Sequence, residues 1–232
     1  MHSRKFYLQA PVPHILHQHK FWVSPERVLF WENESTVIVS DLHIGKTGHF
    51  RKSGIAMPQA VFKEDMLRLV AQLQHFSPNI LLVVGDLFHS VANKELELFE
   101  KWRNDFPDLT IKLVKGNHDI LKNSWYTNAG ITVIHDRTQI KGFCFTHDYE
   151  SCGNITSDDG EDKTLYTISG HIHPGVKVKG FGKQSLCLPC FYFGKDFAVL
   201  PAFSRFTGTA LIEPKAGDSV FALVDNRVIK LK

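Results

Sequence analysis

The stretch Ile80-Leu-Leu-Val-Val-Gly-Asp86 joins a short apolar run to a glycine and a carboxylate. Similar apolar runs recur at wide, fairly regular intervals, at residues 36–40, 111–114, 143–146 and 165–168. Continuous runs of this length, rich in Val and Ile, are typical of strands that are buried on both faces. The middle of the chain therefore predicts a set of core strands.

The residues between these runs show a helical spacing. Between the first two runs, apolar side chains recur at intervals of three and four positions, which places them on one face of a helix: Phe62, Met66, Leu69, Leu73 and Phe76. A second helix is predicted from about residue 92 to residue 105, with Pro107 just beyond its end. Strands that alternate with helices predict an α/β fold with a parallel or mixed sheet.

The two ends of the chain have a different pattern. Residues 14–23 and 27–31 predict a leading hairpin. Near the other end, strands are predicted at residues 186–193, 209–212, 219–224 and 228–231, with turns between them, so we expect this part to be antiparallel. No repeat or linker composition interrupts the sequence, and we expect residues 1–232 to form one domain.

Composition and charge exclude several classes of protein. A hydrophobic content of 43% excludes disorder as the main state. The 27 Lys and Arg against 24 Asp and Glu give a net charge of +3, too small for general binding to polyanions. No signal peptide or membrane-spanning run is recognisable, so we expect no membrane association. Four cysteines are too few for a disulfide scaffold, which favours a reducing, cytoplasmic location.

Each of the five core runs is followed at once by polar side chains that can bind a metal ion. The carboxyl ends of strands in an open α/β sheet are where ligands bind, so we expect these side chains to meet at one edge. Glycines at positions 85, 116 and 170 allow sharp turns there. A single such group is more typical of an ordinary turn, but five groups in order predict a metal site. The candidate ligands are Asp41, His43, Asp86, Asn117, His147, His171 and His173.

The ligand types indicate which metals would bind. Imidazole and carboxylate without thiolate suit Mn, Fe, Zn or Ni, and we expect Mn first. Seven protein ligands are too many for one catalytic ion. Two divalent ions about 3.5–4 Å apart, sharing one carboxylate, would use the whole set and leave positions open for water and substrate.

The series of motifs resembles that of the calcineurin-like metallophosphoesterases. The motifs are Asp41-x-His43, Gly85-Asp86, Gly116-Asn-His-Asp119, His147 and Gly170-His-x-His173. The resemblance implies a two-sheet αββα sandwich with a mixed, largely parallel core. It also implies a phosphodiesterase in which a hydroxide that bridges the two ions attacks phosphorus.

The same resemblance implies roles for individual residues. One ion would be bound by Asp41, His43, Asp86 and His173, and the other by Asp86, Asn117, His147 and His171. Asp86 would bridge the two ions. His118 would donate a proton to the leaving oxygen or stabilise the transition state, and Asp119 would orient it.

Other stretches of the sequence resemble particular groups within this superfamily. The variant Gly85-Asp-Leu-Phe-His89 is similar to the double-strand-break repair nucleases of this superfamily. Residues 41–46, 188–193 and 200–208 look like the bacterial ligase-associated DNA damage response endonuclease group. That likeness implies DNA as the substrate, a context of DNA repair, and association with a DNA ligase and a helicase. Lys46, Arg51 and His89 are candidate contacts to the substrate phosphate.

Two other functions stay open at this point. A small-molecule or cyclic-nucleotide phosphodiesterase, or a phosphomonoesterase, would share every metal ligand. A non-catalytic scaffold of the same fold is a further alternative, although such scaffolds tend to lose ligands and all seven are present here.

Several other patterns are not interpreted as sites. Gly45-Lys-Thr47 is not a P-loop, because Ser40 stands where the motif needs glycine. Cys187 and Cys190 have zinc-knuckle spacing without a second pair nearby, which favours strand packing. His14, His17 and His19 lie in a predicted strand, where core or surface roles are more frequent than metal binding.

Overall fold

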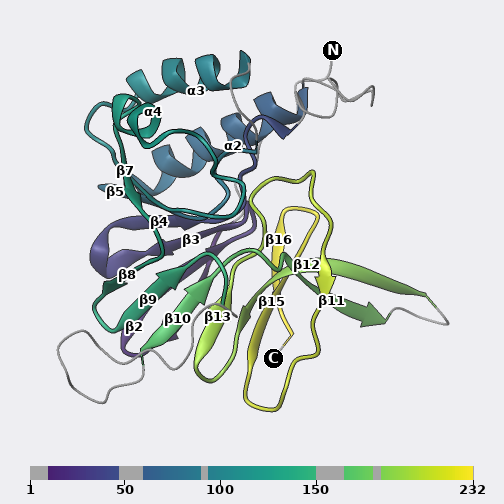
Figure 1. Cartoon of the computed structure of the whole chain (residues 1–232). Coiled ribbons are helices and arrows are strands. Elements are labelled where there is room, and N and C mark those ends of the chain that lie inside the picture. Colours follow the sequence, from purple (N-terminus) through teal and green to yellow (C-terminus); the bar gives the residue numbers. More distant parts are fainter. Residues whose placement is uncertain (1–9, 47–59, 90–93, 150–164, 180–183, 232) are drawn as a thin grey trace.

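The computed structural model describes residues 10–46, 60–89, 94–149, 165–179 and 184–231, and contains two stacked β-sheets (Figure 1). The first sheet has the strand order β1-β2-β3-β4-β5-β6-β7. Its strands β1 to β4 are antiparallel, and β4 to β7 are parallel. The strands are β1 Val12–Leu16, β2 His19–Ser24, β3 Val28–Trp31, β4 Thr36–Val39, β5 Ile80–Val84, β6 Thr110–Val114 and β7 Ile131–Ile134.

The second sheet is mixed and has the order β14-β11-β12-β13-β10-β9-β8, with β15 and β16 continuing from β12. Strands β9, β10 and β13 are parallel neighbours, whereas β8, β12, β15 and β16 pair in antiparallel fashion. The strands are β8 Arg137–Ile140, β9 Phe143–Thr146, β10 Tyr166–Ser169, β11 Pro174–Lys179, β12 Ser185–Phe193, β13 Phe197–Val199, β14 Ala210–Leu211, β15 Ser219–Val224 and β16 Arg227–Lys230.

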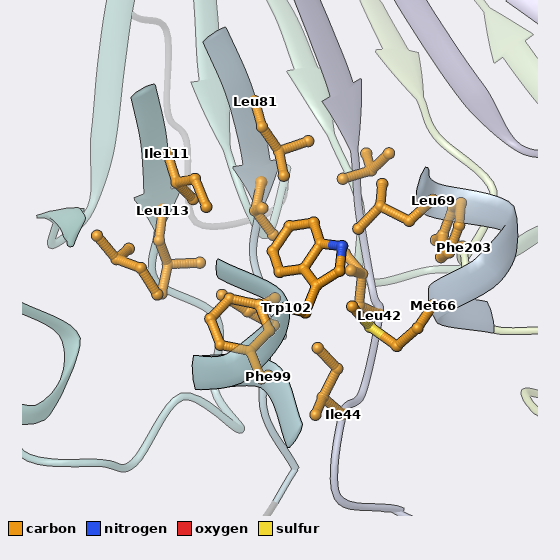
Figure 2. Close-up of a cluster of buried hydrophobic side chains, with 14 of the residues drawn as sticks. Leu42, Ile44, Met66, Leu69, Leu81, Phe99, Trp102, Ile111, Leu113 and Phe203 are labelled. Atoms are coloured by element: carbon orange, nitrogen blue, oxygen red, sulfur yellow. The ribbon is translucent and has the colours of Figure 1, made fainter. Parts of the chain in front are cut away.

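In the part of the chain that the structure describes, three α-helices pack on the outer face of the first sheet: α2 Ala60–Phe76, α3 Lys94–Asn104 and α4 Asn123–Asn128. A short 3-10 helix, Glu32–Glu34, follows β3. Figure 2 shows Phe99 and Trp102 of α3 among Leu81, Ile111 and Leu113 of the sheet. Among the residues that the structure describes, no helix has the length and apolar character needed to cross a membrane.

A second core fills the space between the two sheets and is rich in aromatic rings. Trp31 of the first sheet lies 5.1 Å from Phe143 and 6.0 Å from Phe145 of the second, measured between ring centroids. All three side chains are almost fully buried. Burial of one such side chain contributes about 1.5–3 kcal/mol, so this layer fixes the two sheets, and the strand ends, against each other.

The predicted α/β fold with two sheets is confirmed, and all five core runs form strands. The predicted second helix, from about residue 92, is described from Lys94 to Asn104. The prediction of one long strand at residues 14–23 was wrong. His17 and Gln18 adopt positive φ angles of 45° and 68°, and the turn they form separates β1 from β2.

The three histidines of this region pack against aromatic rings. His14 lies 4.3 Å from Phe193 and His17 lies 5.1 Å from Tyr166, again between ring centroids. His19 accepts a hydrogen bond of 3.2 Å from the indole of Trp31. Cys190 is buried in the core, whereas Cys187 is exposed with its Sγ 3.3 Å from Thr209 Oγ1.

Candidate metal centre

The predicted ligands follow strands of both sheets of the sandwich. Asp41, Asp86 and Asn117 come after β4, β5 and β6 of the first sheet. His147 comes after β9 of the second sheet, and His171 and His173 come after β10. The carboxyl ends of these strands meet between the sheets, where two groups of possible ligands form.

The first group consists of Asp41, His43 and His173. His173 Nε2 lies 3.1 Å and His43 Nε2 lies 3.9 Å from Asp41 Oδ1. The other oxygen of Asp41 is held in place by the hydroxyl of Ser40 and by the backbone N–H of His171, at 3.0 Å for the latter. One oxygen of the Asp41 carboxylate therefore faces two imidazoles, while the other oxygen is fixed by hydrogen bonds.

The second group consists of Asp86, His147 and His171, with Asn117 beside them. His147 Nε2 lies 3.4 Å from Asp86 Oδ2, 3.1 Å from His171 Nδ1 and 3.1 Å from Asn117 Oδ1. These four side chains thus converge on one point at the opening between the sheets.

Asp86 connects the two groups. Its Oδ2 lies 3.4 Å from His147 Nε2 of the second group and 4.0 Å from His43 Nδ1 of the first. Its Oδ1 accepts a hydrogen bond of 2.9 Å from the backbone N–H of His118. A carboxylate in this position can contribute to both groups at once.

The charges of the site are set by burial and by these contacts. Burial lowers the pKa of His43 to about 3, even though Asp41 and Asp86 favour its charged form. Burial would also lower the pKa of His147, but its hydrogen bond to Asp86 and the charge of that carboxylate raise it to about 9. Burial opposes the charge on Asp86, yet the hydrogen bond from His147 lowers its pKa to about 2.

The backbone at the ligands is strained. Asp41, His43, Asp86, His171 and His173 all have φ angles between 49° and 66°, in the left-handed region. For residues other than glycine this conformation costs on the order of 1–3 kcal/mol each and is concentrated at functional sites. Five such residues within one site indicate that the orientation of these side chains lowers the stability of the fold.

The three glycines predicted at the turns are needed for different reasons. Gly85 has a φ of 82°, and a Cβ there would lie 1.9 Å from His147 Nδ1. At Gly116 a Cβ would lie 2.2 Å from Asp86 Oδ1, and at Gly170 it would lie 1.7 Å from Ser40 Oγ. The latter two glycines therefore serve close packing, because no left-handed angle is involved.

The residues fit two divalent metal ions. Both ring nitrogens of His43 are buried and lack a hydrogen-bond partner among the described residues, which is costly unless something else occupies them. Its unprotonated state at neutral pH is the form that ligates metal. The separations of 3.1–3.9 Å within the two groups suit atoms that share an ion at about 2.0–2.2 Å.

His118 lies beside the two groups without being a member of either. Its ring centroid is 5.4 Å from that of His43 and 4.3 Å from that of His89. The carboxylate oxygens of Asp119, the residue predicted to orient His118, accept hydrogen bonds from the backbone N–H groups of Gly116 and Phe88, at 2.9 and 3.0 Å. Asp119 therefore holds the backbone around His118, and burial raises its pKa to about 6.

The structure describes two of the three residues that were predicted to contact the substrate phosphate. His89 lies next to His118 and His43, at the rim of the first group. Lys46 is half-buried nearby, where burial lowers its pKa against the attraction of Asp41 and Asp86. Arg51 lies outside the residues that the structure describes.

Some features of the site were not anticipated from the sequence. Ser40 holds Asp41 through its hydroxyl, and its position directly before the strand-end aspartate was the one available signal. An open groove of about 720 Å³ begins at Asn117, His147 and His171, and its other lining residues belong to no motif.

The chain is similar to known proteins in both sequence and fold. A model of the calcineurin-like phosphoesterase family matches residues 35–184. The structure of Pseudomonas putida nuclease MPE has a TM-score of 0.78 and 24% sequence identity, with 95% of this chain and 100% of that chain covered. The E. coli phosphoesterase Yfce has a TM-score of 0.41 and 13% identity over 84% of this chain and 96% of its own. The comparison with curated proteins gives no match.

Proposed function

Because the chain belongs to the calcineurin-like phosphoesterase family, we propose that it hydrolyses phosphodiester bonds of nucleic acid with two divalent metal ions. The observation that carries this proposal is the position of Asp86 between two groups of imidazole and carboxylate ligands. Asp41, His43 and His173 would hold one ion, Asn117, His147 and His171 the other, and Asp86 both. The ions would supply Lewis-acid polarisation of the phosphodiester and activation of water, and Mn²⁺ is the metal we expect.

The protein's own residues would position the ester and move a proton. The backbone N–H of His118 is fixed on Asp86, so its imidazole stays close to the ligand groups. From there it can donate a proton to the leaving oxygen, which contributes about 10²–10⁴-fold to the rate of a reaction of this kind. Asp119 keeps the surrounding backbone in place through two hydrogen bonds.

Nucleic acid is favoured over a small diester by the shape of the site. The groove at the second ligand group is open and has a volume of about 720 Å³, which suits a chain that continues past the reacting phosphate. The Pseudomonas putida protein of the same fold is described as a nuclease. DNA as the natural strand, a context of DNA repair and association with a ligase and a helicase are proposed from the sequence resemblance.

The test is a comparison of two substrate classes in the presence of Mn²⁺. Wild-type protein, Asp41→Ala and the surface control Asp108→Ala are incubated with an end-labelled single-stranded oligonucleotide and with a panel of cyclic nucleotides. We expect wild type and Asp108→Ala to cleave the oligonucleotide and Asp41→Ala to leave it intact. Turnover of one cyclic nucleotide with an intact oligonucleotide would instead establish the small-molecule phosphodiesterase.

A further inference from the structure

Besides Asn117, His147 and His171, the groove at the second ligand group is lined by residues that take no part in the proposed metal binding. Lys115 follows β6 of the first sheet, and Arg137 is the first residue of β8 in the second. Both cationic residues line the groove, one from each sheet. His135, Asp136 and Asp148 complete the charged and titratable part of its lining.

Both cations are held close to metal-ligand candidates by the backbone. Arg137 pairs with Thr146 across the β8–β9 ladder, and Thr146 directly precedes His147. Lys115 lies two residues before Asn117, and its backbone N–H donates a hydrogen bond of 2.8 Å to the carbonyl of Ile134. Both residues therefore lie close along the backbone to candidate ligands of the second group.

The side chain of Arg137 is free to meet a ligand because it is exposed at the beginning of an edge strand. Lys115 is half-buried, with Nζ 5.5 Å from the centroid of the Tyr126 ring, which limits its range of positions. Arginine forms bidentate hydrogen bonds with phosphate, and lysine acts as a point charge.

The carboxylates in the groove restrict what can bind there. Asp136 and Asp148 would repel a compact, highly charged anion such as a polyphosphate, but they can accept hydrogen bonds from base amino groups or sugar hydroxyls. Two cations and two carboxylates together suit a unit that has one phosphate charge and several hydrogen-bond donors. A nucleotide within a chain has this chemistry.

We propose that this groove binds the nucleotide next to the scissile phosphodiester, with Arg137 and Lys115 on its flanking phosphate. The inference rests on the proposed function and deepens it, because it assigns a binding site for the strand outside the reacting atoms. Small diesters that consist of the reacting group alone do not reach this site.

The experiment uses the ratio of kcat/KM for a single-stranded oligonucleotide to kcat/KM for bis-p-nitrophenyl phosphate, measured with Mn²⁺. Loss of one charge-assisted contact should lower this ratio about tenfold in Arg137→Gln, mainly through KM for the oligonucleotide. Arg137→Lys keeps the charge and should restore part of the ratio. Arg227→Gln is the matched control, because Arg227 is also an exposed first residue of a strand and lies outside the groove lining.

The salt dependence provides a second readout. For a single strand, loss of one phosphate contact should reduce the slope of log kcat/KM for the oligonucleotide against log salt by about 0.7 in Arg137→Gln. A ratio and a slope that match those of Arg227→Gln would overturn the inference. Cleavage of the small diester by wild type with no cleavage of the oligonucleotide would refute the proposed function itself, which is a distinguishable result.

Discussion

Asp86 is the residue at which the two ligand groups meet. Its Oδ2 faces His147 and His43, while its Oδ1 holds the backbone of His118. A carboxylate can share its charge between two cations, whereas a neutral amide of the same shape cannot. The effect of Asp86 on metal binding is therefore expected to extend to both groups.

Asp86→Asn should lower the metal content of both sites and abolish phosphodiester hydrolysis. Elemental analysis after dialysis against Mn²⁺ should find about two ions per wild-type chain and fewer than one in the variant. Asp108→Asn, an exposed change of the same kind, is expected to keep both ions. Two tightly held ions in Asp86→Asn would refute the bridging position.

His118 is expected to act on the leaving group without holding metal. His118→Gln should keep the metal content of wild type and lower kcat by about 10²–10⁴-fold for an oligonucleotide. The loss should be much smaller for bis-p-nitrophenyl phosphate, because a good leaving group needs little protonation. Loss of metal from this variant would place His118 among the ligands instead.

For single residues, the sequence predicted which residues belong to the site better than it predicted their backbone conformations. The seven ligand candidates were recognisable because each follows an apolar run, and the two groups contain the six Asp and His side chains among them. The left-handed φ angles of Asp41 and His43 were not predictable, because their backbone N–H groups bond to Gly85 and Asp86, which follow the neighbouring strand β5. The role of Asp119 likewise depends on a neighbouring turn.

Among the structural elements, the turns after β5 and β6 lie against candidate metal ligands. Gly85 in the first turn lies against His147, and Gly116 in the second lies against Asp86. At Gly116, a Cβ would lie 2.2 Å from Asp86 Oδ1 and 2.5 Å from the backbone nitrogen of Asp86. Backbone cannot move aside as cheaply as the end of a flexible side chain. This turn is therefore expected to tolerate no side chain.

Gly116→Ala should displace Asp86 and lower both metal content and oligonucleotide cleavage. Gly208→Ala is the matched control, because a Cβ there would meet no atom of the described residues within 4 Å and the residue has no left-handed φ. Thermal unfolding of both variants would show whether the fold is retained. Full activity in Gly116→Ala would mean that the turn can shift without moving Asp86.

The β1–β2 hairpin should make stability depend on pH through His14. Burial, together with the charge of Lys230, lowers the pKa of His14 to about 4 from 6.5, while its ring packs on Phe193 and Phe221. Between these two values the unfolded chain binds the proton more readily than the folded chain. The free energy of unfolding should therefore fall as the pH decreases from 6.5 toward 4.

Urea unfolding of wild type and His14→Phe over this pH range would measure the effect. The variant should lose less stability than wild type on acidification, because one of the groups that takes up a proton on unfolding is gone. His75→Phe, at the exposed end of α2, is the matched control and should follow wild type. Parallel curves for wild type and His14→Phe would show that His14 is not linked to folding.

Strands made of buried apolar residues were predictable from the sequence. Strands that form only through hydrogen bonds to a neighbouring strand were not. Strand β5 matches its predicted bounds because every residue from Leu81 to Val84 is buried. Strand β8, Arg137–Ile140, has mostly polar residues and lies at an edge, so its sequence carries no strand pattern. The turn at His17 and Gln18 was missed because neither residue is one of the Gly, Pro, Asn, Asp or Ser residues that dominate turns.

At the scale of the whole molecule, the site exists because two sheets are packed together. Asp41 and His171 are 130 residues apart in sequence, yet the backbone N–H of His171 donates a hydrogen bond of 3.0 Å to the carboxylate of Asp41. The aromatic layer around Trp31 and Phe143 holds the sheets in this relation. Periodicity alone predicted five strand ends, but only the family resemblance implied that two sheets supply them.

We expect these strand ends to hold two metal ions on either side of Asp86. Anomalous diffraction from crystals grown with Mn²⁺, recorded at the manganese absorption edge, would locate both ions. Two peaks should appear about 3.5–4 Å apart. One peak should lie beside Asp41, His43 and His173, the other beside Asn117, His147 and His171, with Asp86 between them. A single peak, or peaks remote from Asp86, would contradict this arrangement.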